Sequence, residues 1–151
     1  MTDAAPLEIT PQINDLIAGG IDSGNVLLLA AVSADGKPIL SYRGSVAVFG
    51  DTSLSAWARN NGGGTVEAIK QNPNVALMYR SHEVPMLQFV GRARIAVSDE
   101  ERNRAFELSH EKEQQADPDR NGTAIIIDLD VISGVLGFNE QGPVFTYMVR
   151  S

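Results

Sequence analysis

The chain has 151 residues, of which 43% are hydrophobic and 21% charged, the composition of an ordinary globular domain. Its 19 acidic residues outnumber its 12 basic residues, and the resulting net charge of -7 disfavours binding to nucleic acid or to an anionic membrane surface. The absence of cysteine excludes disulfides, thiolate nucleophiles and cysteine-ligated metal sites, and the first residues do not resemble a signal peptide. We therefore expect one cytoplasmic domain over residues 1–151.

The N-terminal third of the chain predicts a short helix followed by two strands. Residues 10–19 repeat apolar side chains at helical spacing, with Thr10 placed to cap the first turn and a glycine pair to end the helix. The continuous apolar run over residues 26–32 has the length of a strand that is covered on both faces. A tight Asp-Gly turn then leads into an alternating segment over residues 39–49, which predicts a second strand.

The alternating segment is predicted to present two different faces. Its apolar face consists of Leu40, Tyr42, Val46 and Val48. Its other face is polar and cationic, and consists of Ser41, Arg43 and Ser45. A strand face that carries a cation and no acidic residue suits an anionic ligand better than it suits plain solvation.

The middle of the chain contains an ambiguous segment, a glycine-rich loop and a short helix. Residues 54–58 favour neither helix nor strand, and residues 60–64 have the composition of a loop. Thr65 is placed to cap a helix that Pro73 ends. Free N–H groups at such a helix start, together with Arg59 and Thr65, are typical of phosphate binding, and a mobile surface turn is the alternative.

The second half of the chain predicts four strands and one helix. Strands are expected over residues 75–79, 86–97, 124–132 and 144–149. Ser98 and Glu101 form a capping box that begins a polar helix extending to about Gln115. The long strand carries a second polar face, consisting of Gln88, Arg92 and Arg94. Six strands and three short helices indicate a mainly β protein, a small antiparallel barrel or sandwich.

Several familiar catalytic arrangements find no support in the spacing of the residues. His82 and His110 lack the spacing of a metal site, and no nucleophile elbow is present. Ser109-His110-Glu111 are consecutive on a predicted helix and point in different directions, so they form no triad. Asp128 and Asp130 share a strand face, which we interpret as the solvated side of a half-buried strand.

Three motifs occur in an order that identifies a known family. They are Asp35-Gly36-Lys37-Pro38 before a strand, Asn72-Pro73-x-Val75-Ala76-Leu77, and Phe89-Val90-Gly91-Arg92-Ala93-Arg94. Over roughly residues 10–115 the chain resembles the pyridoxamine 5'-phosphate oxidase-like family of FMN-binding split β-barrels. The resemblance implies a six-stranded antiparallel split β-barrel and a homodimer, with one FMN in each of two clefts between the subunits.

The resemblance also implies a set of residues around the cofactor. These are Ser41, Tyr42, Arg43, Gly44, Ser45, Trp57, Arg59, Thr65 and Gln88. The implied function is that of a flavin-dependent oxidoreductase acting on a small molecule of unknown identity. No side chain is an evident general acid or base, and Tyr42 and His82 are the only guesses.

Two departures from the family pattern leave alternatives open. Many members carry Ser-Arg-Lys where this chain has Gly63-Gly64-Thr65, so phosphate binding would depend on Arg43, Arg59 and backbone N–H groups. The segment 147–151 also lacks the substrate-binding Arg and His of the vitamin B6 oxidases, which disfavours that substrate. The alternatives are a relative that binds haem, with His82 or His110 as iron ligand, one that binds the deazaflavin F420, and a cofactor-free dimer with a structural role.

Overall fold

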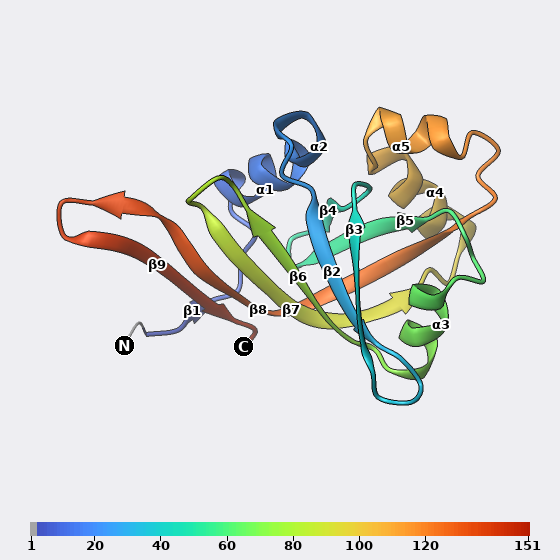
Figure 1. Ribbon diagram of the computed structural model, residues 1–151, viewed down its shortest axis with the longest axis horizontal. Coiled ribbons are helices and arrows are strands. Elements are labelled where there is room, and N and C mark those ends of the chain that lie inside the picture. The colour runs from blue at the N-terminus through green and yellow to red at the C-terminus, as the bar shows by residue number, and fades with distance from the viewer. Residues whose placement is uncertain (1–2) are drawn as a thin grey trace.

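The computed structural model describes residues 3–151, which form one open and strongly curved sheet with short helices at its edges (Figure 1). The strands are β1 (Ala5–Pro6), β2 (Leu27–Val32), β3 (Pro38–Arg43), β4 (Ala47–Gly50), β5 (Ser53–Ala58), β6 (Asn74–Arg80), β7 (Met86–Ile95), β8 (Thr123–Asn139) and β9 (Gly142–Val149). The helices are α1 (Pro11–Ala18), α2 (Gly20–Ser23), α3 (Gly64–Gln71), α4 (Asp99–Leu108) and α5 (Glu111–Ala116).

The order of strands in the sheet explains its shape. The main path runs β1-β9-β8-β7-β6-β2-β3, and the β4–β5 hairpin joins it through the pairing of β5 with β8. Because β8 is 17 residues long, its first half pairs with β5 and its second half pairs with β9. The β8–β9 hairpin therefore extends beyond the rest of the sheet (Figure 1). Nine strands in residues 3–151 replace the six that the sequence predicted, and the mainly β class is confirmed.

Helix α1 confirms the sequence-based expectation for the N-terminal segment. The Thr10 hydroxyl accepts a hydrogen bond from the N–H of Ile13 at 3.3 Å, and Pro11 occupies the first helical position. Ile13 and Ile17 are buried against the sheet. None of the helices in the described part of the chain has the length and apolar character that crossing a membrane requires.

The predicted single strand over residues 39–49 is wrong, because the chain turns at Gly44 and Ser45 and forms β3 and β4. Leu40 and Tyr42 are 71% and 73% exposed, whereas Val46 is buried, so they do not share one face. The turn is held by packing and hydrogen bonds that a sequence pattern does not show. A Cβ atom on Gly44 would lie 2.6 Å from Glu113 Oε1, and the Ser45 hydroxyl is buried against the backbone of Trp57.

Two helix predictions are also corrected. Gly63, not Thr65, is the N-cap of α3, and no side chain caps that helix. The predicted helix from Ser98 to Gln115 divides into α4 and α5, because His110 Nδ1 accepts a hydrogen bond from the N–H of Lys112 and begins a new helix. The Ser98 cap is confirmed, with its hydroxyl 3.1 Å from the N–H of Glu101.

The core has a main part inside the curved sheet and a smaller part beneath α4. The ambiguous segment at residues 54–58 becomes the buried strand β5. The indole of Trp57 packs edge-on against Phe106 of α4, with ring centroids 5.0 Å apart. Its Nε1–H donates to Asp117 Oδ2 at 2.8 Å, which anchors the loop after α5. These contacts join β5 to α4 and to the loop after α5.

Candidate functional site

A cavity of about 300 Å³ lies at the C-terminal end of β3. Six of the nine residues predicted to contact a cofactor line it, together with Asn60 and Glu113. The six are Tyr42, Arg43, Gly44, Ser45, Trp57 and Arg59. The turn between β3 and β4, the end of β5 and helix α5 thus enclose one polar space, and contact of these six residues with a cofactor stays a prediction.

Arg43 carries the main positive charge of this cavity. Its guanidinium donates to the hydroxyl of Ser41 at 3.0 Å and to the hydroxyl of Thr65 at 2.7 Å. The side chain is half-buried, and burial lowers the pKa of Arg43 against the opposing effect of the Glu113 carboxylate. Within residues 3–151 no carboxylate forms an ion pair with Arg43. Its charge is therefore partly desolvated but not neutralised, the state that favours binding of an anion.

Arg59 adds a second positive charge at the mouth of the cavity. It is exposed and forms no ion pair in the described part of the chain. Its charge contributes to lowering the pKa of Arg43, which means that the two guanidinium groups repel each other. An anion between them would relieve this repulsion.

Glu113 is a residue of the cavity that the sequence reasoning missed. It lies on α5, 70 positions after Arg43, and no local motif links the two. Its carboxylate packs on the backbone at Gly44, where a side chain would displace the Glu113 carboxylate. Helix α5 is held in this place by His110, whose Nε2 lies 2.9 Å from Asp22 Oδ1 at the end of α2. The cavity thus presents two cations and one carboxylate, and the carboxylate limits how much negative charge the cavity favours.

Ser45 and Trp57 form the wall of the cavity with polar atoms that already have partners. The Ser45 hydroxyl donates to the carbonyl of Trp57 at 3.0 Å and accepts from its N–H at 2.8 Å. Both residues are buried, and the Trp57 Nε1–H is bound to Asp117. Burial raises the pKa of Asp117, but hydrogen bonds from Trp57, Asn121 and Gly122 outweigh this and lower the pKa overall. Contact of Ser45 and Trp57 with a cofactor stays a prediction.

Gln88 does not line this cavity. It lies on the exposed face of the sheet in one row with Tyr42, Leu28 and Met78, which are paired neighbours on β3, β2 and β6. Three strand positions therefore separate Gln88 from Tyr42, and its predicted contact with a cofactor stays a prediction.

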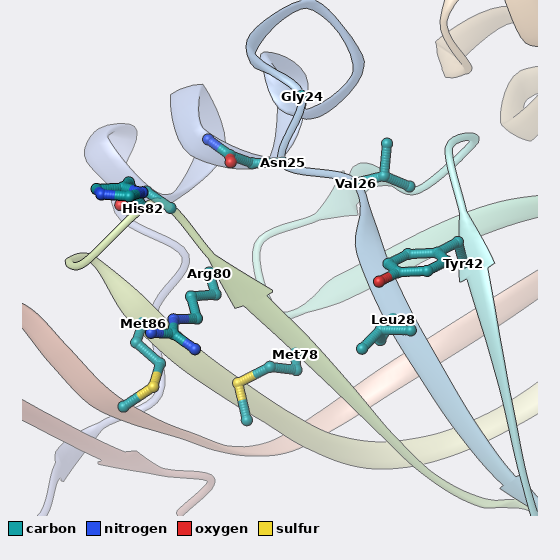
Figure 2. Close-up of a pocket in the computed structure, with 10 residues that line it drawn as sticks. Gly24, Asn25, Val26, Leu28, Tyr42, Met78, Arg80, His82 and Met86 are labelled. Atoms are coloured by element: carbon teal, nitrogen blue, oxygen red, sulfur yellow. The ribbon is translucent and has the colours of Figure 1, made fainter.

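A second hollow of about 930 Å³ opens on this same face (Figure 2). Tyr42 lines both cavities, and His82 lies in the loop at the far end of the second. His110 is engaged with Asp22 and Lys112, at a different place in the fold.

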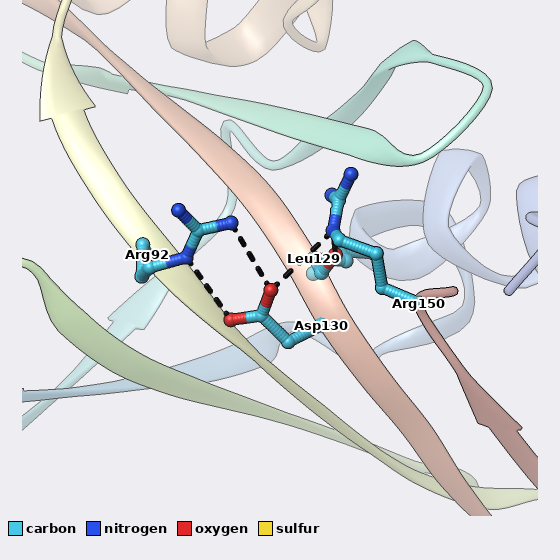
Figure 3. Close-up of polar contacts among 4 residues, drawn as sticks. All are labelled: Arg92, Leu129, Asp130 and Arg150. Carbon is cyan, nitrogen blue, oxygen red and sulfur yellow. Dashed lines mark hydrogen bonds and ion pairs between the residues drawn. The ribbon is translucent and has the colours of Figure 1, made fainter.

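The second predicted cationic face is not available to a ligand. Arg92 binds both oxygens of Asp130 at 3.1 and 3.2 Å, and Arg150 approaches the same carboxylate at 3.4 Å (Figure 3). Arg94 binds both oxygens of Glu101 at 2.7 Å, and these hydrogen bonds lower the pKa of Glu101 to about 2. Arg92 and Arg94 are thus each paired with a carboxylate, so the second polar face predicted on the long strand presents no unpaired arginine.

The comparison with family models agrees with the fold. Residues 9–134 match the model described as pyridoxamine 5'-phosphate oxidase. The chain belongs to this family. The match includes β3, α3 and the first half of β8, and it ends before the C-terminal hairpin is complete.

Solved structures similar to this one come from several bacteria. HupZ of group A Streptococcus is 24% identical, with 89% of this chain and 97% of that chain covered and a TM-score of 0.63. An FMN-binding protein of Syntrophomonas wolfei is 10% identical, with 79% and 80% covered and a TM-score of 0.61. A Clostridium acetobutylicum protein related to general stress protein 26, of the pyridoxinephosphate oxidase family, is 16% identical, with 87% and 89% covered and a TM-score of 0.60.

These likenesses show a shared fold. The open sheet is the split β-barrel of the pyridoxamine 5'-phosphate oxidase-like proteins, as the resemblance in the sequence implied. No curated protein matches the chain.

Proposed function

We propose that this protein is a flavin-dependent oxidoreductase that binds FMN, with the cofactor phosphate between Arg43 and Arg59. The observation that carries the proposal is the half-buried guanidinium of Arg43, held by two hydroxyls and by no ion-paired carboxylate in residues 3–151. The family and the similarity to an FMN-binding protein support it.

The residues of the cavity fit a phosphate monoester. Arg43 can offer its remaining N–H groups, and Arg59 can approach from the solvent side. The hydrogen bond from Arg43 to Thr65 ties the start of α3 to the cavity, in place of the basic residues that many relatives carry there. Bound FMN would supply the redox chemistry, while these residues would hold and orient it.

We further propose that the protein acts as a homodimer through the exposed face of its sheet. Registered pairs place Tyr42, Leu28, Met78, Gln88, Ser133 and Tyr147 in one continuous row across six strands. Leu40, Tyr42, Phe145 and Tyr147 on this face are between 40% and 73% exposed. Large apolar side chains that are exposed at both ends of one sheet face mark an interaction surface. A partner on this face would also cover Gln88.

The test is FMN retention by the double variant R43A/R59A. Purified protein is mixed with FMN, freed of excess cofactor and examined by its visible spectrum. We expect flavin bands with the wild type and none with the double variant. The control K37A/K70A removes two cations from exposed ion pairs and should retain FMN. Retention by R43A/R59A, or a wild type that rejects FMN, would contradict the proposal, and a Soret band would indicate haem instead.

A further inference from the structure

The dipeptide Asn-Gly occurs twice in this chain, as Asn61-Gly62 in the loop before α3 and as Asn121-Gly122 just before β8. Asparagine followed by glycine is the pair most prone to spontaneous deamidation. In this reaction the backbone nitrogen of the glycine attacks the side-chain amide carbon of the asparagine, and the missing Cβ of glycine leaves the approach open. Because the two pairs are equivalent in sequence, the fold decides which of them reacts.

Asn61-Gly62 lies at the tip of an exposed turn. The N–H of Gly63 donates to the carbonyl of Asn60 at 3.1 Å and closes the turn. The Gly62 N–H donates to the side-chain oxygen of Asn60 at 3.1 Å, in contact with solvent. A Cβ atom on Gly62 would have its nearest neighbour at 3.8 Å, so this residue is loosely packed. Water can replace the bond to Asn60, which leaves the Gly62 nitrogen free to turn towards the Asn61 side chain.

Asn121-Gly122 is held by a buried carboxylate instead. The N–H groups of Asn121 and Gly122 donate to Oδ1 and Oδ2 of Asp117, at 3.0 and 2.8 Å. Asp117 is only 7% exposed, and a Cβ atom on Gly122 would overlap the carbonyl oxygen of Ala58. Loss of the proton from the Gly122 nitrogen would place a second negative charge beside this carboxylate and would break a buried hydrogen bond. Asn121 is therefore protected from the reaction.

We propose that Asn61 is a site of spontaneous deamidation and that Asn121 is not. The Gly62 nitrogen loses its proton and forms a bond to Cγ of Asn61, while the C–N bond of the side-chain amide breaks. The side-chain nitrogen leaves as ammonia and takes up that proton. Water then opens the cyclic imide at either carbonyl and gives aspartate or isoaspartate. The net change is a hydrolysis that requires water alone.

The product affects the cavity around Arg43, the Arg43 cavity, in two ways. The Asn61 amide donates to the carbonyl of Asn121 at 3.2 Å and ties the loop to the start of β8, a bond that a carboxylate cannot form. The new charge also lies two positions after Arg59, which lines the cavity and has no ion-pair partner within residues 3–151. Deamidation thus gives Arg59 a nearby carboxylate and weakens anion binding. Only this consequence rests on the proposed function.

The experiment incubates the full chain without flavin at mildly alkaline pH, digests samples with trypsin and follows both sites by mass spectrometry. Cleavage after arginine and lysine places the two sites in separate peptides, residues 60–70 and 121–150. In the folded protein we expect Asn61 to react at least about tenfold faster than Asn121, the factor that corresponds to one hydrogen bond lost at the reacting nitrogen. In protein unfolded by urea, the two sites should react at similar rates.

The variant G62A is the matched control, because its Cβ hinders the attack but has room in the fold. Asn61 should react at least about tenfold more slowly in this variant than in the wild type. Fragment ions distinguish Asn61 from Asn60. The proposal would be overturned by equal rates at Asn61 and Asn121 in the folded protein, by reaction at Asn60 instead, or by an unchanged rate in G62A.

The variant N61D tests the consequence for the cavity by itself. We expect it to bind FMN about fivefold more weakly than the wild type, because an exposed carboxylate lies near Arg59. N61A loses the bond to Asn121 without gaining a charge, and its FMN affinity should stay within about twofold of the wild type. An equal loss in both variants would contradict the effect of the charge. Deamidation is measured without flavin, so a wild type that rejects FMN would refute the proposed function and leave the result for Asn61 standing.

Discussion

Two groups of arginines look alike in the sequence and differ in the structure. Arg92 on β7 forms two hydrogen bonds with the carboxylate of Asp130 on β8, which also approaches Arg150 (Figure 3). Arg43 lies between the hydroxyls of Ser41 and Thr65. The first group joins β7, β8 and the segment after β9, and both of its guanidinium groups have a carboxylate partner. The second leaves a positive charge inside a cavity, so the neighbouring side chains, not the residue type, separate an arginine paired with a carboxylate from one that is not.

The pKa directions express the same difference. Hydrogen bonds with Asp130 raise the pKa of Arg92, because they stabilise the charged guanidinium. Burial lowers the pKa of Arg43, because the charge is held away from water without a bound carboxylate. An incoming anion would give Arg43 the negatively charged partner that it lacks and that Arg92 already has in Asp130.

The largest expected effect comes from giving Arg43 a carboxylate of its own. T65D replaces the hydroxyl 2.7 Å from the Arg43 guanidinium and creates an ion pair like that of Arg92. We expect FMN affinity, measured by quenching of flavin fluorescence, to fall at least about 100-fold through charge repulsion. The control T65N has nearly the same shape as T65D but no charge, and its FMN affinity should fall much less. Similar losses in both variants would show that the Thr65 hydroxyl, not the charge balance, matters.

A smaller effect in the opposite direction is expected from E113Q. This change removes the carboxylate that shares the cavity with Arg43 and Arg59. FMN should bind about five- to tenfold more tightly, since a negative charge near the phosphate is lost. Riboflavin, which has no phosphate, should bind as before. E111Q on the same helix removes a charge that lies outside the cavity lining and is the control. Weaker binding of both flavins in E113Q would mean that Glu113 accepts hydrogen bonds from the ribityl chain.

The paired arginines predict an effect of pH on stability. The hydrogen bonds from Arg94 lower the pKa of Glu101 from 4.5 to about 2 in the folded protein. The stability from this pair is complete above pH 4.5 and is lost as the pH falls towards about 2. Urea unfolding between these pH values should show a steeper loss for the wild type than for E101Q. E100Q, which changes the neighbouring exposed residue, should follow the wild type, and an equal slope in E101Q would contradict the pairing.

The smallest effect is expected from D130N, because its ion pairs are largely exposed to solvent. The thermal midpoint should fall by about 2–4 °C in low salt and by less in high salt, where such pairs are screened. FMN binding should stay at the wild-type level. A loss of FMN binding in D130N would contradict this expectation, because it would show that the ion pairs of Asp130 affect the Arg43 cavity.

Local sequence signals were sufficient to predict helix caps and helix boundaries, because these depend on residues close together in the chain. The Thr10 and Ser98 caps form within four residues of their partners, and both appear as expected. The glycine and proline boundaries of α1 and α3 are likewise local. The family motifs were sufficient to identify the split barrel and six of the residues that line the Arg43 cavity.

Other features depended on contacts between distant parts of the chain. Residues 39–49 alternate like one strand, yet Ser45 turns the chain by binding Trp57, 12 positions away. Glu113 reaches the cavity from α5, which contacts between distant residues hold in place, such as His110 with Asp22, 88 positions apart, and Trp57 with Asp117, 60 positions apart. No pattern within either segment reports these contacts.

The sequence by itself determined the mainly β class, the family and the local caps, because these follow from hydrophobic periodicity and from residues close together in the chain. Only the tertiary structure decided which arginines are free. Arg92 and Asp130 are 38 positions apart, and Arg43 and Thr65 are 22 apart. Whether the charge of a guanidinium is available to a ligand depends on the group next to it. Strand register and helix placement determine which group that is.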